Sequence, residues 1–428
     1  FIYLYYYMNI AVIGSGGREH SVCFKLRQSK KINKIFCFPG NAGTSKIAQN
    51  VNINVLNFKD ISNFLKNNNT KIVFVGPEVP LVNGIKDYLE KKGFFIFGPS
   101  KAASRLEKSK SFTKTLCKKY KIPTANYKSF NSMKGVKEYI DKMNVPIVIK
   151  ADGLASGKGV FICKNKNTAL QKCKAINQGK FKSSKKFVIE EFLSGEEASY
   201  FILSDGKNYK FFGTAQDHKR IGEGDTGPNT GGMGAYSPSN IINEVVEEKI
   251  KKQIIEPTLR GLKKMGCPFV GVLYAGLIIK NNQPKLIEYN IRLGDPESQV
   301  LMMRLKTDLL KIILACKNKQ INKIPINWSR KKAITIVASS KGYPNKKDAI
   351  SEIKNLENIK INNNQYIFHA ATFKKDNKIY SSGGRVLNVT ALNKNLRSAR
   401  NVCIKMLKKI HWKDKYFRKD IGWRAISN

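Results

Sequence analysis

The segment VIKADGLASGKGV, residues 148–160, places a glycine-rich turn between two apolar runs. A Walker A phosphate loop needs four residues between its two glycines and a Ser or Thr after its lysine, whose hydroxyl binds magnesium. Here only three residues separate Gly153 from Gly157, and Gly159 follows Lys158. This spacing excludes a P-loop NTPase. The segment instead predicts a strand, a flexible lid and a second strand.

The overall composition is that of a globular protein with a strong positive charge. The chain has 428 residues, 42% of them hydrophobic, which is enough for about two to four domains with buried cores. Lysine and arginine total 77 against 31 acidic residues, a formal net charge of +46. Such a charge often marks nucleic-acid binding, but the lysines are spread along the whole chain. We therefore expect no nucleic-acid partner and small anionic substrates, which the charge attracts.

The cysteines and the apolar segments indicate the cellular compartment in which the protein is expected. The chain has eight cysteines and four histidines, and no two cysteines form a C-x-x-C pair, so the spacing of a zinc site is absent. Such cysteines are typical of free thiols in a reducing cytoplasm. No apolar run reaches the roughly 18 residues that a membrane-spanning helix needs, so we expect a cytoplasmic protein without membrane contact. The strand MNIAVIG begins at Met8, and we expect residues 1–7 not to belong to the native start.

Residues 8–108 alternate short apolar runs that end in glycine with segments of helical periodicity. This alternation predicts a doubly wound parallel sheet. The first turn, GSGGREH, does not match the dinucleotide fingerprint G-x-G-x-x-G, because Glu19 occupies the third glycine position. The turn can still bind a phosphate at the helix N-terminus, with Arg18 as the anion partner. The alternative is that Arg18 is a surface arginine.

The later segments predict antiparallel strands mixed with helices. Residues 109–322 contain hairpin patterns, residues 321–332 are a linker candidate, and residues 333–428 form a separate block. That block ends in a predicted helix whose apolar residues share one face, namely Leu396, Ala399, Cys403, Met406, Leu407 and Ile410.

Two oxygen-bearing side chains lie close together in the segment LIEYN. In a regular strand, Leu286, Glu288 and Asn290 point to one face, and Ile287 and Tyr289 point to the other. A carboxylate and an amide two residues apart suit a magnesium ion that bridges nucleotide phosphates. The alternative is a solvated strand face.

The segment AQDHKRIGEGDTGPNTGGMGAYSP, residues 215–238, combines charged side chains with six glycines and two prolines. This mixture predicts a long loop, and a long charged loop inside an ordered domain is usually functional. His218 in this segment is a candidate general base with no visible partner. The alternative is a solvated loop residue.

Several motifs together carry a family resemblance over residues 8–428. In chain order they are GSGGREH, PGNAGT, GPEVPL, KADGLASGKGV, EEFLSGEEAS, DHKRIGEGDTGPNTGGMGAYSP, IEYNIRLGDPE and SSGGRVL. They resemble the phosphoribosylamine-glycine ligases, which are ATP-grasp enzymes of purine biosynthesis. The resemblance implies a phosphoribosylamine-binding α/β domain (8–108), an ATP-grasp domain (109–322) with a mobile lid at about 125–200, and a small α+β C-terminal domain (333–428).

The resemblance also implies a reaction. ATP, glycine and 5-phosphoribosylamine would give glycinamide ribonucleotide, ADP and phosphate through a glycyl phosphate, with Mg²⁺ or Mn²⁺ as the cofactor. This chemistry needs charge neutralisation and positioning more than an acid–base pair, which suits a site rich in lysine, arginine and metal ligands. We expect a monomer that acts on small molecules.

The resemblance assigns roles residue by residue. The ATP contacts would be Lys110, Lys150, Gly157, Lys158, Glu190, Glu191 and Glu197. The metal ligands would be Glu288 and Asn290, and the catalytic residues Arg292, Asp217 and Lys219. The substrate-binding residues would be Gly16, Gly17, Arg18, Asn41, Gly76, Pro77, Glu78, Asp225, Asn229 and Gly231. One departure is Ala371, because the family usually has glycine at this position. The alanine would shift the backbone there if the position requires glycine.

Two alternatives stay open. A formate-dependent transformylase or a carboxylase would share the ATP-grasp fold and the metal pair, but it would lack the segment at 215–238. A noncatalytic anion-binding or nucleic-acid-binding protein would explain the charge, but it would have no need for Glu288 and Asn290 on one face.

Overall fold

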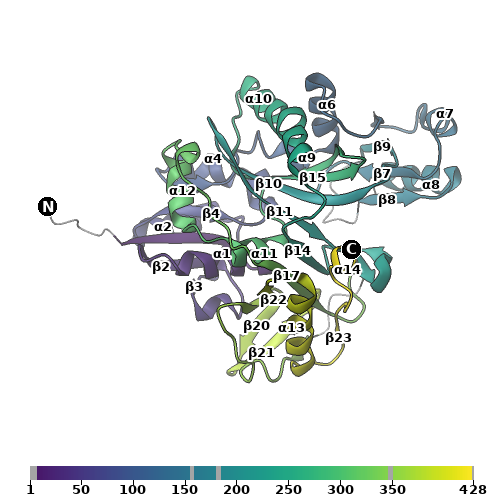
Figure 1. Ribbon diagram of the computed structural model, residues 1–428. Helices are drawn as coiled ribbons and strands as arrows, with labels where there is room; N and C mark the ends of the chain where they lie inside the picture. Colours follow the sequence, from purple (N-terminus) through teal and green to yellow (C-terminus); the bar gives the residue numbers. More distant parts are fainter. Residues whose placement is uncertain (1–6, 155–158, 180–184, 346–349, 427–428) are drawn as a thin grey trace.

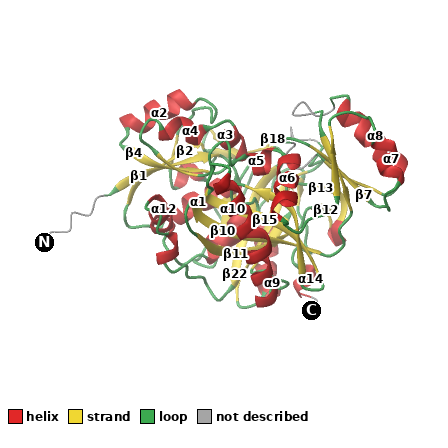
Figure 2. Ribbon diagram, turned by 90° about the horizontal axis from the view of Figure 1, so that it is seen from above, coloured by secondary structure: helices red, strands yellow, loops and turns green. Residues whose placement is uncertain are grey.

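The computed structural model describes residues 7–154, 159–179, 185–345 and 350–426. Figure 1 shows a sheet close to the N-terminus, a long central sheet, and a C-terminal part below it. Figure 2 shows a small sheet with α7 and α8 at the opposite end of the molecule from β1, β2 and β4. Within the described ranges, none of the helices has the length and apolar character that a membrane span requires.

The N-terminal sheet is parallel, with the strand order β3-β2-β1-β4-β5. Its strands are β1 (Met8–Gly14), β2 (Ile32–Pro39), β3 (Gln49–Asn50), β4 (Thr70–Val75) and β5 (Phe95–Phe97). The helices that accompany it are α1 (Gly17–Arg27), α2 (Phe58–Asn67), α3 (Glu78–Val82) and α4 (Ile85–Glu90). The predicted doubly wound sheet is confirmed.

Both faces of this sheet are covered. Ala11 and Ile13 of β1 pack in one core with α2 and α4, whereas Ile10 and Val12 pack in another core with α1. Strands that are buried on both sides are continuously apolar, which explains the run IAVIG. The chain order reverses on either side of β1, and sheets of this kind bind ligands at the carboxyl ends of their strands at such a point.

The lid sheet, as we name it, consists of β6 (Tyr127–Phe130), β9 (Phe187–Glu191), β7 (Ile147–Ala151) and β8 (Val160–Cys163), in that order. It is antiparallel and is accompanied by α7 (Val136–Asp141) and α8 (Lys166–Asn177). The strands predicted on both sides of the glycine-rich turn are confirmed, because β7 pairs with β8 from Ile147–Cys163 to Lys150–Val160. The tip of that turn, residues 155–158, lies outside the described residues.

The central sheet follows the order β16-β15-β10-β11-β14-β17-β22-β19, with β23 paired to β17. Its strands are β10 (Glu196–Asp205), β11 (Tyr209–Asp217), β14 (Gly234–Ser237), β15 (Val270–Lys280), β16 (Gln283–Asn290), β17 (Lys332–Ser340), β19 (Gln365–His369), β22 (Arg385–Asn393) and β23 (Lys415–Tyr416). β14 pairs with β17 across the predicted linker, from Gly234–Ile336 to Ser237–Ala333. The sheet therefore joins the predicted central and C-terminal domains, and their boundary stays a prediction.

The remaining elements lie outside these three sheets. The helices are α5 (Arg105–Lys108), α6 (Lys110–Tyr120), α9 (Glu244–Lys249), α10 (Glu256–Lys264), α11 (Glu297–Arg304), α12 (Leu309–Lys317), α13 (Leu396–Lys409) and α14 (Trp423–Ile426), with a π-helical turn at Ile250–Ile255 and 3₁₀ turns at Thr44–Lys46, Glu223–Asp225 and Ile321–Lys323. The small strands are β12 (Arg220–Gly222), β13 (Thr226–Asn229), β18 (Ile350–Glu352), β20 (Thr372–Lys375) and β21 (Lys378–Ser382). Of these, β18, β21 and β20 form a small sheet of their own.

Three sequence-based expectations can be compared with these elements. The predicted apolar face of α13 is confirmed, because its residues and Ile410 are buried in one core. The cysteines are all buried and free. The expectation that residues 215–238 form a long loop is wrong, because β12 and β13 pair as a hairpin and β14 joins the central sheet. The turn between β12 and β13 uses positive φ angles at Gly224 (65°) and Gly227 (75°), which glycine adopts at little steric cost.

Candidate active site

A cavity of about 550 Å³ lies where the N-terminal sheet, the lid sheet and the central sheet meet. The sequence-predicted residues that line it are Arg18, Pro77, Glu78, Lys110, Lys150, Glu190, Glu191, Glu197, Asp217, Lys219, Asn229, Gly231, Glu288, Asn290 and Arg292. The predicted residues absent from its described lining are Gly16, Gly17, Asn41, Gly76 and Asp225. Gly157 and Lys158 lie outside the described residues.

Two buried lysines share one carboxylate at the lid side of the cavity. Glu190 Oε2 of β9 lies 2.9 Å from Lys150 Nζ of β7 in an ion pair, and Glu190 Oε1 lies 3.3 Å from Lys114 Nζ of α6. Burial lowers the pKa of Lys114, although Glu190 opposes the shift. Sequence reasoning missed Lys114. The signal was present, because Lys114 lies one helical turn after Lys110 and so on the same face of α6.

Glu191 and Glu197 are held differently. Glu191 accepts hydrogen bonds from the backbone N of Asn126 at 2.9 Å and from its Nδ2 at 3.1 Å. Glu197 Oε2 accepts from Lys219 Nζ at 2.8 Å, and both side chains are partly accessible. Glu191 belongs to the lid sheet and Glu197 to the central sheet, and the lining that they share also includes apolar side chains such as Val148 and Ile278.

Asp217, at the end of β11, faces other carboxylates. Burial raises the pKa of Asp217 to about 7, Lys219 opposes the shift, and Glu297 and Glu197 add to it. Burial also disfavours the charged form of Lys219, but Glu197 and Asp217 raise its pKa well above the ordinary value. Glu297, which sequence reasoning missed, is buried and accepts from Ser199 Oγ at 3.2 Å. A carboxyl group with a pKa near 7 can both accept and release a proton at neutral pH.

The metal-ligand candidates lie at the end of β16. Glu288 stands opposite Gly276 and Asn290 opposite Tyr274 on β15, and both candidates line the cavity. Neither side chain makes a hydrogen bond or ion pair with any described residue. Although burial opposes ionisation, Lys219, with the lysines and arginine nearby, lowers the pKa of Glu288. An ionised carboxylate beside an unpartnered amide fits a hard divalent cation.

The predicted alternation of LIEYN is wrong in one respect. A register shift between Gly276 and Leu277 of β15 leaves Ile287 as an extra residue, which is a β-bulge. As a result Leu286 is buried in the same core as Tyr289 instead of facing the side of Glu288. The carbonyl of Ile287 accepts from Lys150 Nζ at 3.2 Å.

Arg292 joins two carboxylates from different parts of the chain. Its Nε lies 3.3 Å from Glu78 Oε2 of α3, and its Nη2 lies 2.7 Å from Glu107 Oε1 of α5. Burial opposes ionisation of Glu78, but Arg292 and Arg18 lower its pKa to about 2. Burial raises the pKa of Glu107 in spite of Arg292. Sequence reasoning missed Glu107, which lies in a basic stretch with no motif of its own.

The turn after β1 is held by hydrogen bonds to Glu19. Arg18 is buried, so the alternative of a surface arginine is wrong. The Nε of Arg18 donates to Glu19 Oε1 at 2.5 Å, and its Nη1 donates to Leu293 O at 3.2 Å. Glu19 Oε2 accepts from Gly16 N at 2.6 Å. A Cβ at Gly76 would lie 2.0 Å from Glu19 Oε1, so a larger residue there would displace the Glu19 side chain. In this structure Gly16 and Gly76 therefore accommodate Glu19.

Two further predicted positions have structural partners. Asn41 Nδ2 donates to Ser15 O at 2.8 Å and to His369 O at 2.9 Å, so it links the first turn to β19. A Cβ at Gly17 would lie 2.5 Å from Gln299 Nε2 of α11, so glycine permits this close approach. Ala371 is absent from the described residues with positive φ. Its backbone conformation does not require glycine.

His218 and Asp225 lie behind the cavity wall. His218 is buried and its Nε2 accepts from Gly422 N at 3.0 Å, so the solvated-loop alternative is wrong. Burial and Arg418 lower the pKa of His218 to about 4. Asp225 accepts from Arg418 Nη1 at 2.9 Å and from Arg424 Nη2 at 2.8 Å.

Three buried histidines predict a pH-dependent stability. Burial is the main cause that lowers the pKa of His218 to about 4 and of His369 to about 3, and it lowers that of His20 well below the ordinary value. As pH falls below about 6.5, the unfolded chain binds protons that the folded chain does not, so stability is complete above that pH and decreases below it. We expect the free energy of unfolding to fall by up to about 1.4 kcal/mol per pH unit for each histidine.

Denaturant unfolding between pH 6.5 and 5.5 measures this slope. Burial raises the pKa of Asp217 to about 7, so this carboxyl group contributes to the slope with the opposite sign, equally in every variant, and the slopes are therefore compared between variants. His218→Gln should reduce the slope by about one proton. His411→Gln is the control because that side chain is exposed. Equal slopes in all three proteins would contradict the prediction.

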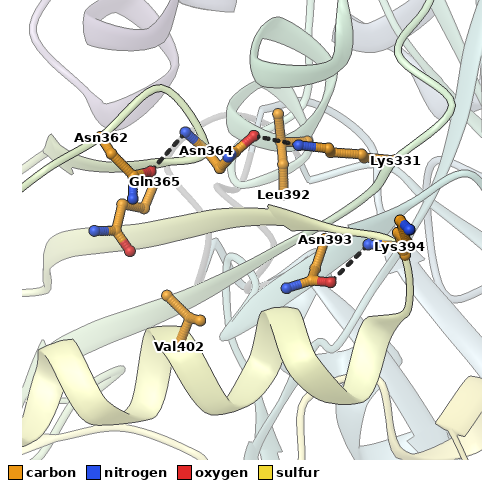
Figure 3. Close-up of a pocket in the computed structure, with 8 residues that line it drawn as sticks. All are labelled: Lys331, Asn362, Asn364, Gln365, Leu392, Asn393, Lys394 and Val402. Carbon is orange, nitrogen blue, oxygen red and sulfur yellow. Dashed lines mark hydrogen bonds between the residues drawn. The ribbon is translucent and has the colours of Figure 1, made fainter.

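A smaller cavity of about 300 Å³ lies beside β22 and α13 (Figure 3). Its lining is mostly polar but includes Leu392 and Val402, and Lys331 Nζ donates to Asn364 Oδ1 at 2.8 Å. It includes none of the residues predicted for the site, and we assign no function to it.

Comparisons with known proteins agree with the geometry. Family models match three consecutive stretches: the N domain of phosphoribosylglycinamide synthetase at residues 8–107, its ATP-grasp (A) domain at 108–298 and its C domain at 333–424. The phosphoribosylamine–glycine ligase of Mesorhizobium japonicum is 46% identical over 421 residues, which cover 98% of this chain and 99% of that protein. The corresponding ligase of Brucella melitensis is 44% identical over 420 residues, 98% of each chain.

Solved structures show the same fold. The crystal structure of phosphoribosylamine–glycine ligase from Thermotoga maritima has a TM-score of 0.85 at 31% identity, and the match covers 96% of this chain and 100% of that chain. The biotin carboxylase domain of the Hydrogenobacter thermophilus 2-oxoglutarate carboxylase, at 15% identity and a TM-score of 0.75, covers 98% of this chain and 94% of that one and shares the fold alone. The chain belongs to the phosphoribosylglycinamide synthetase family.

Proposed function

We propose that this protein ligates glycine to 5-phosphoribosylamine, with conversion of ATP to ADP and phosphate, through a glycyl phosphate. The observation that carries the proposal is the convergence of Lys150, Glu288, Asn290 and Arg292 on one cavity. These groups come from the lid sheet and the end of the central sheet. A cluster of positive charge and oxygen ligands suits phosphoryl transfer to a carboxylate, which is a poor electrophile until it is phosphorylated.

The nucleotide would lie between the lid sheet and the central sheet. Lys110 and Lys150 would neutralise phosphate oxygens, and Glu190 would keep Lys150 in place through their 2.9 Å ion pair. The apolar lining near Val148 and Ile278 would receive the adenine ring, with Glu191 and Glu197 at its polar edge. The glycine-rich lid would close over the phosphates and exclude water from the acyl phosphate.

Glu288 and Asn290 would hold Mg²⁺ or Mn²⁺. The support is their donor chemistry, one ionised carboxylate and one amide, together with the lack of hydrogen bonds to the described residues. The bound cation would offset the negative charge of the β- and γ-phosphates. Arg292, which Glu78 and Glu107 orient, would lie beside the transferred group.

The amine that attacks an acyl phosphate must lose a proton. Asp217 is the candidate acceptor, because its pKa near 7 leaves part of the population ionised at neutral pH. Lys219 would offset the charge that develops on the oxygens of the acyl group. Arg18, Pro77, Glu78, Asn229 and Gly231 would bind phosphoribosylamine and glycine. We further propose a cytoplasmic monomer without a nucleic-acid partner, in keeping with its buried free thiols.

The proposal predicts which substrates are required. Formation of ADP should need both glycine and phosphoribosylamine, and omission of either should reduce it to background. Formate or bicarbonate should not replace glycine. With glycine labelled by ¹⁸O in its carboxylate, one label should appear in the released phosphate, because phosphorylation joins that oxygen to phosphorus. Turnover with formate or bicarbonate instead of glycine would overturn the assignment in favour of a transformylase or a carboxylase.

A further inference from the structure

The C-terminal tail, defined here as residues 416–424, lies against the hairpin β12–β13. Figure 1 shows α14 beside β14 and β17. Tyr416 Oη donates to Ile221 O at 2.9 Å. The backbone N of Lys419 donates to Glu223 Oε1 at 2.9 Å. These contacts join segments almost 200 residues apart in the sequence.

Arg418 is the centre of this contact. Its side chain is fully buried, with 0% exposure. Its Nη1 donates to Asp225 Oδ1 and to Arg220 O, both at 2.9 Å. Its Nε and Nη2 donate to Asp420 at 2.8 and 2.7 Å. A buried guanidinium whose donors are used in this way holds its partners in one geometry.

Asp225 is enclosed by the tail. Besides Arg418, its carboxylate accepts from Trp423 Nε1 at 3.2 Å and from Arg424 Nη2 at 2.8 Å. Asp225 is also absent from the described lining of the active-site cavity. Its carboxylate is therefore placed to anchor the tip of the hairpin rather than to contact a substrate.

The two ends of the same hairpin do line the cavity. Asp217 and Lys219 precede β12, and Asn229 ends β13. Thr230 N donates to Lys219 O at 2.7 Å, which closes the base of the hairpin. His218, between the two cavity residues, accepts from Gly422 N of the tail at 3.0 Å.

We propose that the C-terminal tail is a positioning element of the active site, which acts through the Arg418–Asp225 contact and the His218–Gly422 hydrogen bond to aim Asp217 and Lys219 into the cavity. This inference rests on the proposed function for the roles of Asp217 and Lys219. It reassigns Asp225 from substrate binding to positioning. The nucleotide groups Lys150 and Glu190 belong to the lid sheet and take part in neither the Arg418–Asp225 contact nor the His218–Gly422 hydrogen bond.

A double-mutant cycle tests the inference, with Arg418→Gln, Asp225→Asn and both together. Each single variant should lower kcat about tenfold or more and raise the KM for glycine, while the KM for ATP stays within about twofold. The loss of kcat in the double variant should be smaller than the product of the two single losses, because both changes remove the Arg418–Asp225 contact. Lys419→Gln is the matched control, because it removes a tail charge whose exposed side chain is not part of the contact.

The proposal would be overturned if the fold-losses of kcat in the two single variants multiply in the double variant. It would also be overturned if Arg418→Gln has a normal kcat and a normal KM for glycine while Asp225→Asn is impaired. If Arg418→Gln does not fold, Trp423→Phe removes the indole N–H donor to Asp225 and keeps an aromatic ring. This variant should still lower kcat, and a normal kcat would count against the proposal. Hydrogen exchange is independent of activity: amides of residues 220–229 should lose protection in the variants while those of β7 keep it. If wild-type protein lacks the ligase reaction, the exchange result still decides the positioning role.

Discussion

Glu288→Gln is expected to lower turnover about 10²-fold or more and to leave the fold intact. Glutamine keeps the volume and one oxygen but removes the charge that the proposed cation site needs. A loss of about 3 kcal/mol of transition-state stabilisation corresponds to roughly two decades in rate. The side chain of Glu288 makes no hydrogen bond or ion pair with a described residue, so its replacement should leave the protein folded, with only the longer-range attraction of the nearby lysines and arginine lost.

The measurement is ADP formation over a magnesium titration, with thermal unfolding in parallel. The variant should need more Mg²⁺ for half-maximal rate. Glu196→Gln is the control, because Glu196 is exposed on β10 of the same sheet and is not among the cavity-lining residues described. Near-normal turnover of a folded Glu288→Gln protein at limiting Mg²⁺ would remove the metal role.

Arg292→Met is expected to damage both stability and activity. It leaves Glu78 and Glu107 without their shared partner, and both are largely buried, at 21% and 8% side-chain exposure. Removal of one partner from a buried ion pair typically costs about 3–5 kcal/mol. Loss of the arginine beside the transferred phosphoryl group should lower kcat by about 10² or more.

A second variant separates the two effects. Arg292→Met combined with Glu107→Gln removes one of the two stranded carboxylates, so it should recover part of the stability lost in Arg292→Met. Turnover should stay low, because the positive charge is still absent. Denaturant unfolding and steady-state kinetics on the same preparations make the comparison. Recovery of turnover together with stability would show that Arg292 has only a structural role.

Local patterns in the sequence were sufficient for the fold class. The apolar runs of residues 8–108 predicted the parallel sheet, because strands covered on both faces must be apolar throughout, as β1 is. The glycine spacing at 153–159 predicted a turn between two strands, and β7 and β8 pair around it. The apolar face of α13 followed from helical periodicity.

Local patterns were insufficient where the partner is distant in the chain. The glycine-rich composition of residues 215–238 predicted a loop, yet the tail supplies Arg418 and Gly422 to a hairpin there, and this contact buries His218. The β-bulge at Ile287 could not be predicted from the sequence either, because it depends on the register of β16 against β15.

The candidate site shows the same division. Sequence alone predicted Lys150, Glu288, Asn290 and Arg292, through short motifs and the family resemblance that these motifs carry, and all four line one cavity. Only the tertiary structure decided their partners, such as Lys114 for Glu190 and Glu107 for Arg292. A buried charge is stable only beside a compensating charge or hydrogen bond. Which charge compensates it depends on how the sheets pack together, and no local pattern in the chain records that packing.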